Sequence, residues 1–141
     1  MKRMVGWFAV LALMSVGCGG GLQTVPVRGK VTFGDGGPLK GGRVEFRSEA
    51  EATKNLNARG EVDADGDFKL TTFVDGKELD GAVVGPHKVT VFPPDYTQPA
   101  SLDSQPPPSP VPQRYRSYDS SKLEVTVEPG KADYPIRLER K

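Results

Sequence analysis

The amino-acid sequence predicts an all-β protein, an antiparallel two-sheet sandwich of about seven strands preceded by a helical signal segment. Apolar and polar residues alternate from Val27 to Leu138, as they do in strands that are buried on one face only. Gly and Pro are abundant, with 17 and 13 residues, which favours short strands joined by many turns. The alternating runs are not separated by the amphipathic helices that connect parallel strands, so antiparallel sheets are expected.

The first 17 residues have the pattern of a secretory signal peptide. Lys2 and Arg3 make the start positive, and residues 4–16 form a mostly apolar run. That run is too short to cross the ~30 Å hydrocarbon layer of a bilayer, which needs roughly 20 apolar residues. We therefore expect export of the protein and removal of residues 1–17.

The leader ends at the only cysteine of the chain. Residues 15–18, Ser-Val-Gly-Cys, resemble the bacterial lipobox, although Ser15 stands where that pattern prefers Leu. The lipobox implies that Cys18 is lipidated and becomes the mature N-terminus, with residues 18–25 as a flexible tether. A lone free thiol would be a liability in an oxidising exterior, which favours lipidation over the alternative of an unmodified cysteine. Two acyl chains anchor a protein firmly, whereas one is marginal.

The expected export of the protein and its net charge restrict the kinds of partner it can have. The formal net charge is +1, and it becomes −1 when the leader with Lys2 and Arg3 is removed, so nothing in the charge favours nucleic acid. The membrane is the expected first partner, through the lipid anchor, and an envelope protein or a glycan would be the second. Gly19, rather than Asp, follows Cys18, which by analogy with sorting in other bacteria favours the outer over the inner membrane.

Residues 26–139 are expected to form the sandwich domain. Its first element is predicted to be a β-hairpin over residues 26–46, with a glycine-rich turn between two alternating runs. Asp65-Gly66 predicts a second hairpin turn. Further strands are expected over residues 60–62, 68–73, 86–92, 123–127 and 134–138. Pro135 has no backbone N–H to donate to a neighbouring strand, so the last strand is expected at a sheet edge.

Three segments are expected to lie outside the strands. Residues 93–112 are Pro-rich and should form an extended surface loop, with a docking site for a Pro-recognising partner as the alternative. Residues 48–59 are polar and suit either a loop or one or two helical turns. Residues 75–85 are predicted to be a turn region.

Two groups of residues invite a metal or catalytic interpretation. Asp63, Asp65 and Asp67 alternate as in a calcium-binding loop, but the Gly at position six and the Glu at position twelve of that loop are missing. We interpret them as a turn, with a weak Ca²⁺ site as the alternative. His87 is the only histidine and is expected at the surface or at a strand edge. We predict no catalytic residue, no metal and no cofactor.

Three tyrosines near the Pro-rich segment are candidates for a binding surface. Tyr96, Tyr115 and Tyr118 are expected to face solvent, where aromatic rings suit sugars and protein interfaces.

Several short motifs occur along the chain in an order that is typical of one protein family. They are Gly17-Cys18, VRGKVTF at 27–33, GPL at 37–39, GRVEF at 42–46, DGDF at 65–68, GPHKVTV at 85–91, RY at 114–115 and SKLEVTV at 121–127. In this order they resemble the carboxypeptidase regulatory-like (transthyretin-like) domain, in the small lipoprotein form found in planctomycete bacteria. The resemblance covers most of residues 25–138. It implies a prealbumin-like sandwich in an exported lipoprotein, without the zinc domain that the related domain accompanies in carboxypeptidases.

Three functions are compatible with this resemblance. The first is a non-catalytic, lipid-anchored protein with a structural or binding role at the cell envelope, and the second is a glycan- or protein-binding module. The third is an enzyme similar to the transthyretin-like hydroxyisourate hydrolases. Those hydrolases end in Tyr-Arg-Gly-Ser and carry several histidines, whereas residues 115–117 here are internal and lack the Gly. We therefore predict that the protein is not an enzyme.

Overall fold

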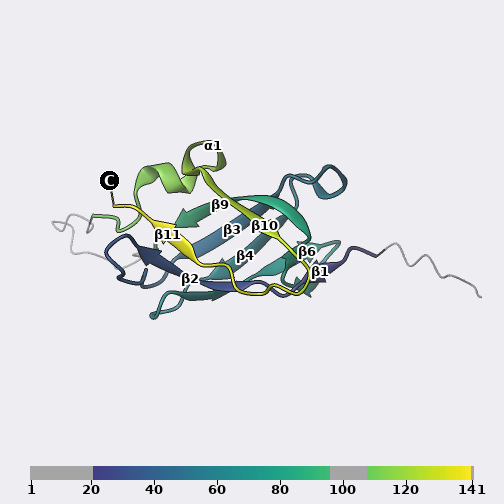
Figure 1. The fold of residues 1–141 in the computed structure, drawn as a ribbon, viewed down its shortest axis with the longest axis horizontal. Helices are drawn as coiled ribbons and strands as arrows, with labels where there is room; N and C mark the ends of the chain where they lie inside the picture. Colours follow the sequence, from purple (N-terminus) through teal and green to yellow (C-terminus); the bar gives the residue numbers. More distant parts are fainter. Residues whose placement is uncertain (1–20, 96–107, 141) are drawn as a thin grey trace, which may run out of the picture.

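The computed structural model describes residues 21–95 and 108–140, so Cys18, Tyr96 and the expected helical signal segment lie outside the described residues. The described residues form a β-sandwich, as predicted (Figure 1). Six strands form the larger sheet in the order β10-β9-β3-β4-β6-β7, and three form the second sheet in the order β11-β2-β5. A short pair, β1 with β8, lies at one end of the molecule (Figure 1).

All neighbouring strands of the larger sheet are antiparallel. Its strands are β3 (Arg43–Ser48), β4 (Asn57–Glu61), β6 (Thr71–Val74), β7 (Lys77–Asp80), β9 (Gly85–Phe92) and β10 (Leu123–Val127). On β3 the side chains of Val44 and Phe46 are fully buried, while Arg43 and Arg47 are partly exposed. The predicted alternation therefore holds, and it gives this sheet one face in the core and one outer face.

The second sheet contains one parallel pair, which the expected antiparallel sandwich did not include. Its central strand, β2 (Arg28–Phe33), pairs antiparallel with β5 (Asp67–Lys69) and parallel with β11 (Ile136–Leu138). The last strand lies at an edge of this sheet, as expected from Pro135, which directly precedes it.

The hairpin predicted over residues 26–46 is wrong. β2 and β3 belong to different sheets, and the chain between them folds back on β2 before it crosses the sandwich. The fold-back is a bridge between Thr32 and Pro38, with a hydrogen bond of 2.9 Å from the Leu39 amide to the Val31 carbonyl. Alternation shows which face of a strand is buried but not which strand lies beside it, and two facing sheets share one core.

The Asp65-Gly66 turn is confirmed, and the strand that follows it passes through both sheets. Val62 pairs with Phe68 across the turn. β5 then pairs in the second sheet and β6 in the larger one, with the fully buried Leu70 between them. The Leu70 amide donates to the Val27 carbonyl at 2.9 Å, and its carbonyl accepts from the Gly81 amide at 2.8 Å. The backbone is thus hydrogen-bonded where it changes sheets.

Three boundaries differ from the prediction. β1 (Thr24–Val25) pairs with β8 (Ala82–Val83), so the expected tether of residues 18–25 ends in a strand and the expected turn region contains two strands, β7 and β8. The connection between β3 and β4 contains a single 3-10 turn, η1 (Glu51–Thr53), and β4 begins three residues earlier than expected. At the end of the Pro-rich segment Val111 is buried in the core, so the surface loop is shorter than residues 93–112.

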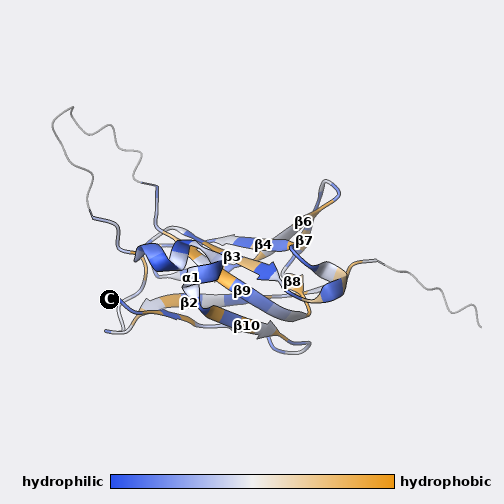
Figure 2. Cartoon of the chain, turned by 90° about the horizontal axis from the view of Figure 1, so that it is seen from above, coloured by the Kyte–Doolittle hydropathy of each residue, from blue (hydrophilic) through white to orange (hydrophobic). Residues whose placement is uncertain are grey.

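The connection that leads into β10 is the longest helical stretch of the described chain. It contains a 3-10 helix, η2 (Gln113–Arg116), and a short α-helix, α1 (Tyr118–Ser121), whose cap residue Ser117 accepts a 3.4 Å hydrogen bond from the Asp119 amide. Figure 2 shows α1 as a hydrophilic element on the outside of the sandwich. No helix in the described part of the chain is long and apolar enough to cross a membrane.

Candidate functional site

The outer face of the larger sheet carries charged and aromatic side chains in rows across neighbouring strands. The register places Arg43 of β3 directly between Phe92 of β9 and Glu61 of β4. In the next row Glu45 lies between Thr90 and Arg59. Side chains opposite one another in a sheet are close enough to interact, so the residues of each row are neighbours, although Thr90 and Glu45 of the second row are buried.

Glu45 is the most buried charged residue of this face. Its side chain is surrounded by two guanidinium groups, with Arg43 Nε at 3.0 Å and Arg59 Nε at 3.4 Å from Oε1. The Tyr118 hydroxyl donates to Oε2 at 3.2 Å. A carboxylate that leaves water needs charged or hydrogen-bonded partners, and these three groups supply them.

Tyr118 connects α1 to the sheet beneath it. Its ring lies 4.1 Å from the Arg47 guanidinium carbon, and its hydroxyl is 3.5 Å from Asn57 Oδ1. Burial, followed by the negative charge of Glu45, raises the pKa of Tyr118. The hydroxyl therefore remains a proton donor to Glu45 at neutral pH. Among the three tyrosines expected to face solvent, Tyr118 is half-buried beside the candidate site.

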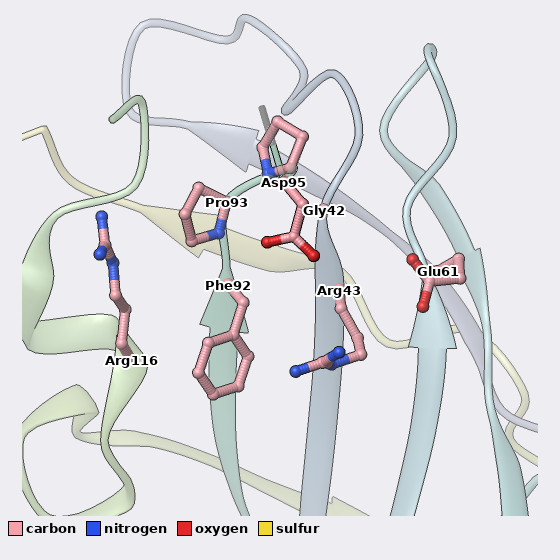
Figure 3. Close-up of a pocket in the computed structure, with 8 residues that line it drawn as sticks. Gly42, Arg43, Glu61, Phe92, Pro93, Asp95 and Arg116 are labelled. Carbon is pink, nitrogen blue, oxygen red and sulfur yellow. The ribbon is translucent and has the colours of Figure 1, made fainter. Parts of the chain in front are cut away.

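A pocket of about 430 Å³ lies at the end of this face, next to the last residue of β9 (Figure 3). Two consecutive prolines that follow β9 form part of its wall, and its other lining residues are Gly42, Arg43, Glu61, Phe92, Asp95 and Arg116. Figure 3 shows the Phe92 ring between the Arg43 and Arg116 side chains. The Arg43 guanidinium carbon lies 5.0 Å from the centre of that ring.

The backbone at the edge of the pocket requires a glycine. Gly42 has a φ of +106°, and a Cβ at this position would overlap the Phe92 carbonyl oxygen and lie 3.2 Å from the Pro93 carbonyl carbon. Gly42 therefore allows the start of β3 to approach the end of β9. This close approach holds Arg43 and Phe92 side by side at the pocket.

The two arginines of the pocket are held in different ways. Arg43 Nε is within ion-pair distance of Glu45, but its N–H is not directed at the carboxylate. Arg116 comes from η2, and its Nη2 donates to the Val111 carbonyl at 3.2 Å. Neither buried Nε atom has a hydrogen-bond partner among the described residues. The guanidinium groups are thus positioned by their surroundings and can also contact a ligand through their terminal N–H groups.

Tyr115 does not face solvent, contrary to our expectation. Its side chain is 5% exposed and belongs to the hydrophobic core. Its hydroxyl accepts hydrogen bonds from Arg114 Nη2 at 3.0 Å and from the Glu139 amide at 2.9 Å. The ring fills the core where η2 packs on the sandwich, and the hydroxyl ties η2 to the end of the chain. Tyr115 is therefore excluded from the expected binding surface.

The three aspartates of the second turn do not converge on one point. Asp63 Oδ1 accepts from the amides of Asp65 at 2.8 Å and Asp67 at 3.0 Å, and the Asp67 carboxylate lies 3.6 Å from Lys30 Nζ. Asp63 thus organises the turn, as side chains of this type do. No group of three or more His, Cys, Asp or Glu residues in the described ranges is arranged to hold a metal ion.

His87 lies inside the sandwich and not at the surface. Its side chain is 2% exposed and packs against Phe46, with ring centres 6.0 Å apart. Nδ1 donates to the Gly85 carbonyl at 2.9 Å. Burial lowers the pKa of His87, and this effect exceeds that of the carbonyl, which raises it. The imidazole is therefore expected to be neutral at pH 7.

The lowered pKa predicts that His87 makes folding sensitive to mild acid. Below its ordinary pKa of 6.5 the unfolded chain binds a proton at this residue, whereas the folded chain resists it, so stability falls as the pH decreases. The loss is at most about 1.4 kcal/mol per pH unit for one proton. In His87→Gln we expect a smaller pH dependence of the free energy of unfolding between pH 6.5 and 5. Urea unfolding at several pH values measures this, and equal slopes in both proteins would contradict it.

The sequence interpretation did not identify Arg43, Phe92 or Arg116 as site residues. One signal was present in β9, where Phe92 occupies an outward position after Lys88 and Thr90. A large apolar side chain at a position that alternation assigns to solvent is a weak signal, because single apolar residues are common on protein surfaces, as Phe73 is here.

Comparison of the chain with protein-family models, with curated proteins and with solved structures finds no match in any of the three.

Proposed function

We propose that this protein is an exported, lipid-anchored, non-catalytic β-sandwich with a structural or binding role at the cell envelope, more specifically at the outer membrane. The observation that carries the proposal is the position of the only cysteine, Cys18, directly after a charged and then apolar leader. We also propose membership of the carboxypeptidase regulatory-like family, which the two-sheet architecture supports.

The position of β1 limits how far the sandwich could lie from a lipid anchor at Cys18. β1 begins at Thr24, six residues after Cys18, so a fully extended connection would reach at most about 20 Å. The sandwich would therefore stay close to the bilayer. Figure 1 shows β1 at one end of the sandwich and the end of β9 toward the other. The pocket is lined by Phe92, the last residue of β9. An anchor at Cys18 would leave the pocket on the side away from the membrane.

The anchor predicts that Cys18→Ala abolishes lipidation and releases the protein from membranes. Metabolic labelling with a fatty-acid analogue, followed by membrane fractionation, measures both effects. Ser15→Leu is a matched control, because it brings the leader closer to the lipobox pattern and should keep or increase labelling. A Cys18→Ala protein that still fractionates with membranes would contradict the proposal.

The surroundings of His87 support a role without catalysis. A general base has to reach its substrate, and this imidazole is enclosed in the core with its Nδ1 bonded to a backbone carbonyl. A glycan- or protein-binding function is the second candidate, and the observation that favours it is the pocket beside Phe92. A hydrolase of the hydroxyisourate type is the third and has no such support.

A further inference from the structure

The pocket at the end of β9 combines an aromatic ring with side chains that can both donate and accept hydrogen bonds. Phe92 lines the pocket together with the guanidinium groups of Arg43 and Arg116, which donate, and with the carboxylates of Asp95 and Glu61, which accept (Figure 3). A saccharide ring presents an apolar C–H face and, at its edge, hydroxyl groups that need both kinds of partner. Planar guanidinium and carboxylate groups can bind two neighbouring hydroxyls at once.

The charges of the pocket favour an uncharged ligand. Arg43 and Arg116 carry two positive charges, and Glu61 and Asp95 carry two negative charges. These charges cancel, and Glu45 further compensates Arg43 at 3.0 Å. An anion would gain little net attraction here, and a cation would meet the guanidinium groups. A neutral, hydroxyl-rich molecule uses the donors and acceptors without requiring a net field.

The size and position of the pocket suit part of a longer chain. Its volume of about 430 Å³ is within the range of small-molecule sites. The row of Phe92, Arg43 and Glu61 crosses three strands, which is about 10 Å and comparable to two sugar rings. The Arg43 side chain is 41% exposed, so a ligand can approach it from solvent.

We propose that the pocket formed by Phe92, Arg43 and Arg116 binds a neutral polysaccharide. One sugar ring would pack its C–H face on the side of the Phe92 ring that Arg43 does not cover, and its hydroxyls would bond to the arginines and to Asp95 or Glu61. This inference rests on the envelope location proposed above and specifies the ligand class of the binding role. A protein partner fits less well, because the pocket is small and its walls are mostly polar.

The test is a binding titration with the full mature chain in a zwitterionic, sugar-free detergent. Cellohexaose and mannohexaose serve as neutral probes and hexagalacturonate as the acidic one, with isothermal calorimetry as the readout. We expect at least one neutral hexasaccharide to bind and the acidic one to bind no better. Phe92→Leu keeps an apolar side chain but removes the aromatic ring, and should weaken binding about tenfold. Arg43→Gln should weaken it similarly.

Two matched variants separate the pocket from the rest of the sandwich. Arg137→Gln removes an arginine of the second sheet that pairs with Glu139 and lines neither this pocket nor the hollow beside it. Val84→Ala removes an exposed apolar side chain between β8 and β9 that is also outside both. Both should bind like the unchanged protein. If Arg43→Gln fails to fold, as judged by circular dichroism, Arg116→Gln on the surface helix η2 takes its place.

The outcomes decide between this inference and the function proposed above. Binding of neither neutral probe, stronger binding of the acidic probe, or unchanged binding in Phe92→Leu would overturn the saccharide site. None of these results affects the lipid anchor, which is judged by labelling of Cys18. Conversely, a chain that is not labelled would overturn the anchor, while its pocket can still be titrated after purification.

Discussion

Replacing Phe46 by Ala is expected to lower the free energy of unfolding by about 3–5 kcal/mol. Phe46 is 0% exposed and lies on β3, the strand between β9 and β4 in the larger sheet. Its ring packs against Phe68 of the second sheet, with ring centres 6.2 Å apart, and against His87. Truncation of Phe46 would remove its contact with Phe68 across the two sheets and leave a cavity. A loss of this size is a large part of the 5–15 kcal/mol that holds a typical domain folded.

Phe73→Ala provides the matched control for this prediction. Phe73 is 60% exposed on β6, so its removal should change stability by no more than about 0.5 kcal/mol. Urea unfolding followed by far-ultraviolet circular dichroism is suitable for both variants. The only tryptophan, Trp7, lies in the proposed leader, so tryptophan fluorescence would not report on a protein from which that leader has been removed. Similar losses in the two variants would show that Phe46 is not at the centre of the core.

Gly29→Ala is expected to destabilise the protein by at least about 3 kcal/mol, although it adds a single methyl group. A Cβ at Gly29 would lie 2.8 Å from the Tyr134 carbonyl carbon, closer still to the carbonyl oxygen, and 2.9 Å from the Phe68 ring. Backbone atoms cannot move aside as a side chain can. The Tyr134 amide also donates to the Arg28 carbonyl at 2.8 Å, so the methyl group would disturb the connection that leads into the parallel β2–β11 pair.

Gly21→Ala tests whether the effect of Gly29→Ala is due to this contact. A Cβ at Gly21 would have no neighbouring atom within 4 Å among the described residues. We expect Gly21→Ala to leave the midpoint of thermal unfolding within about 1 °C, and Gly29→Ala to lower it by more than about 10 °C. If Gly29→Ala melts together with the control, the close approach of β2 to Tyr134 is incorrect.

The sequence predicted β9 and β10 well because their signal is local, whereas β1, β7 and β8 were not predicted. Alternation and turn residues identify β9 and β10 almost to the residue, since each pattern lies within eight residues of the chain. The pairing of β2 was not predictable in this way. Its two partners are β5 and β11, and the second of these lies about 100 residues further along. The strands β2 and β3 were predicted to form a hairpin because both alternate and a glycine-rich turn lies between them, but neither signal identifies the partner strand.

The candidate site was less predictable because its residues come from separate elements. Arg43 and Phe92 meet only through the register between β3 and β9, and Arg116 joins them from η2. Tyr115 and Tyr118 are equally aromatic and only three residues apart, yet one lies in the core and the other over the sheet. The turn between η2 and α1 separates them, and composition does not predict such a turn.

The short pair β1–β8 has a mechanical consequence for an anchored protein. It has only two residues in each strand and is the first element after the proposed anchor. A force between the bilayer and a polysaccharide bound in the pocket would act on this pair first, because it is nearest to the proposed anchor. The pair would also separate first, because it has far fewer backbone hydrogen bonds than the two sheets. Its release would lengthen the connection to the anchor by about 10 Å over residues 24–26, because Val27 is held in the core. The distance between the bilayer and the bound polysaccharide could thus increase while the core of the sandwich remains folded.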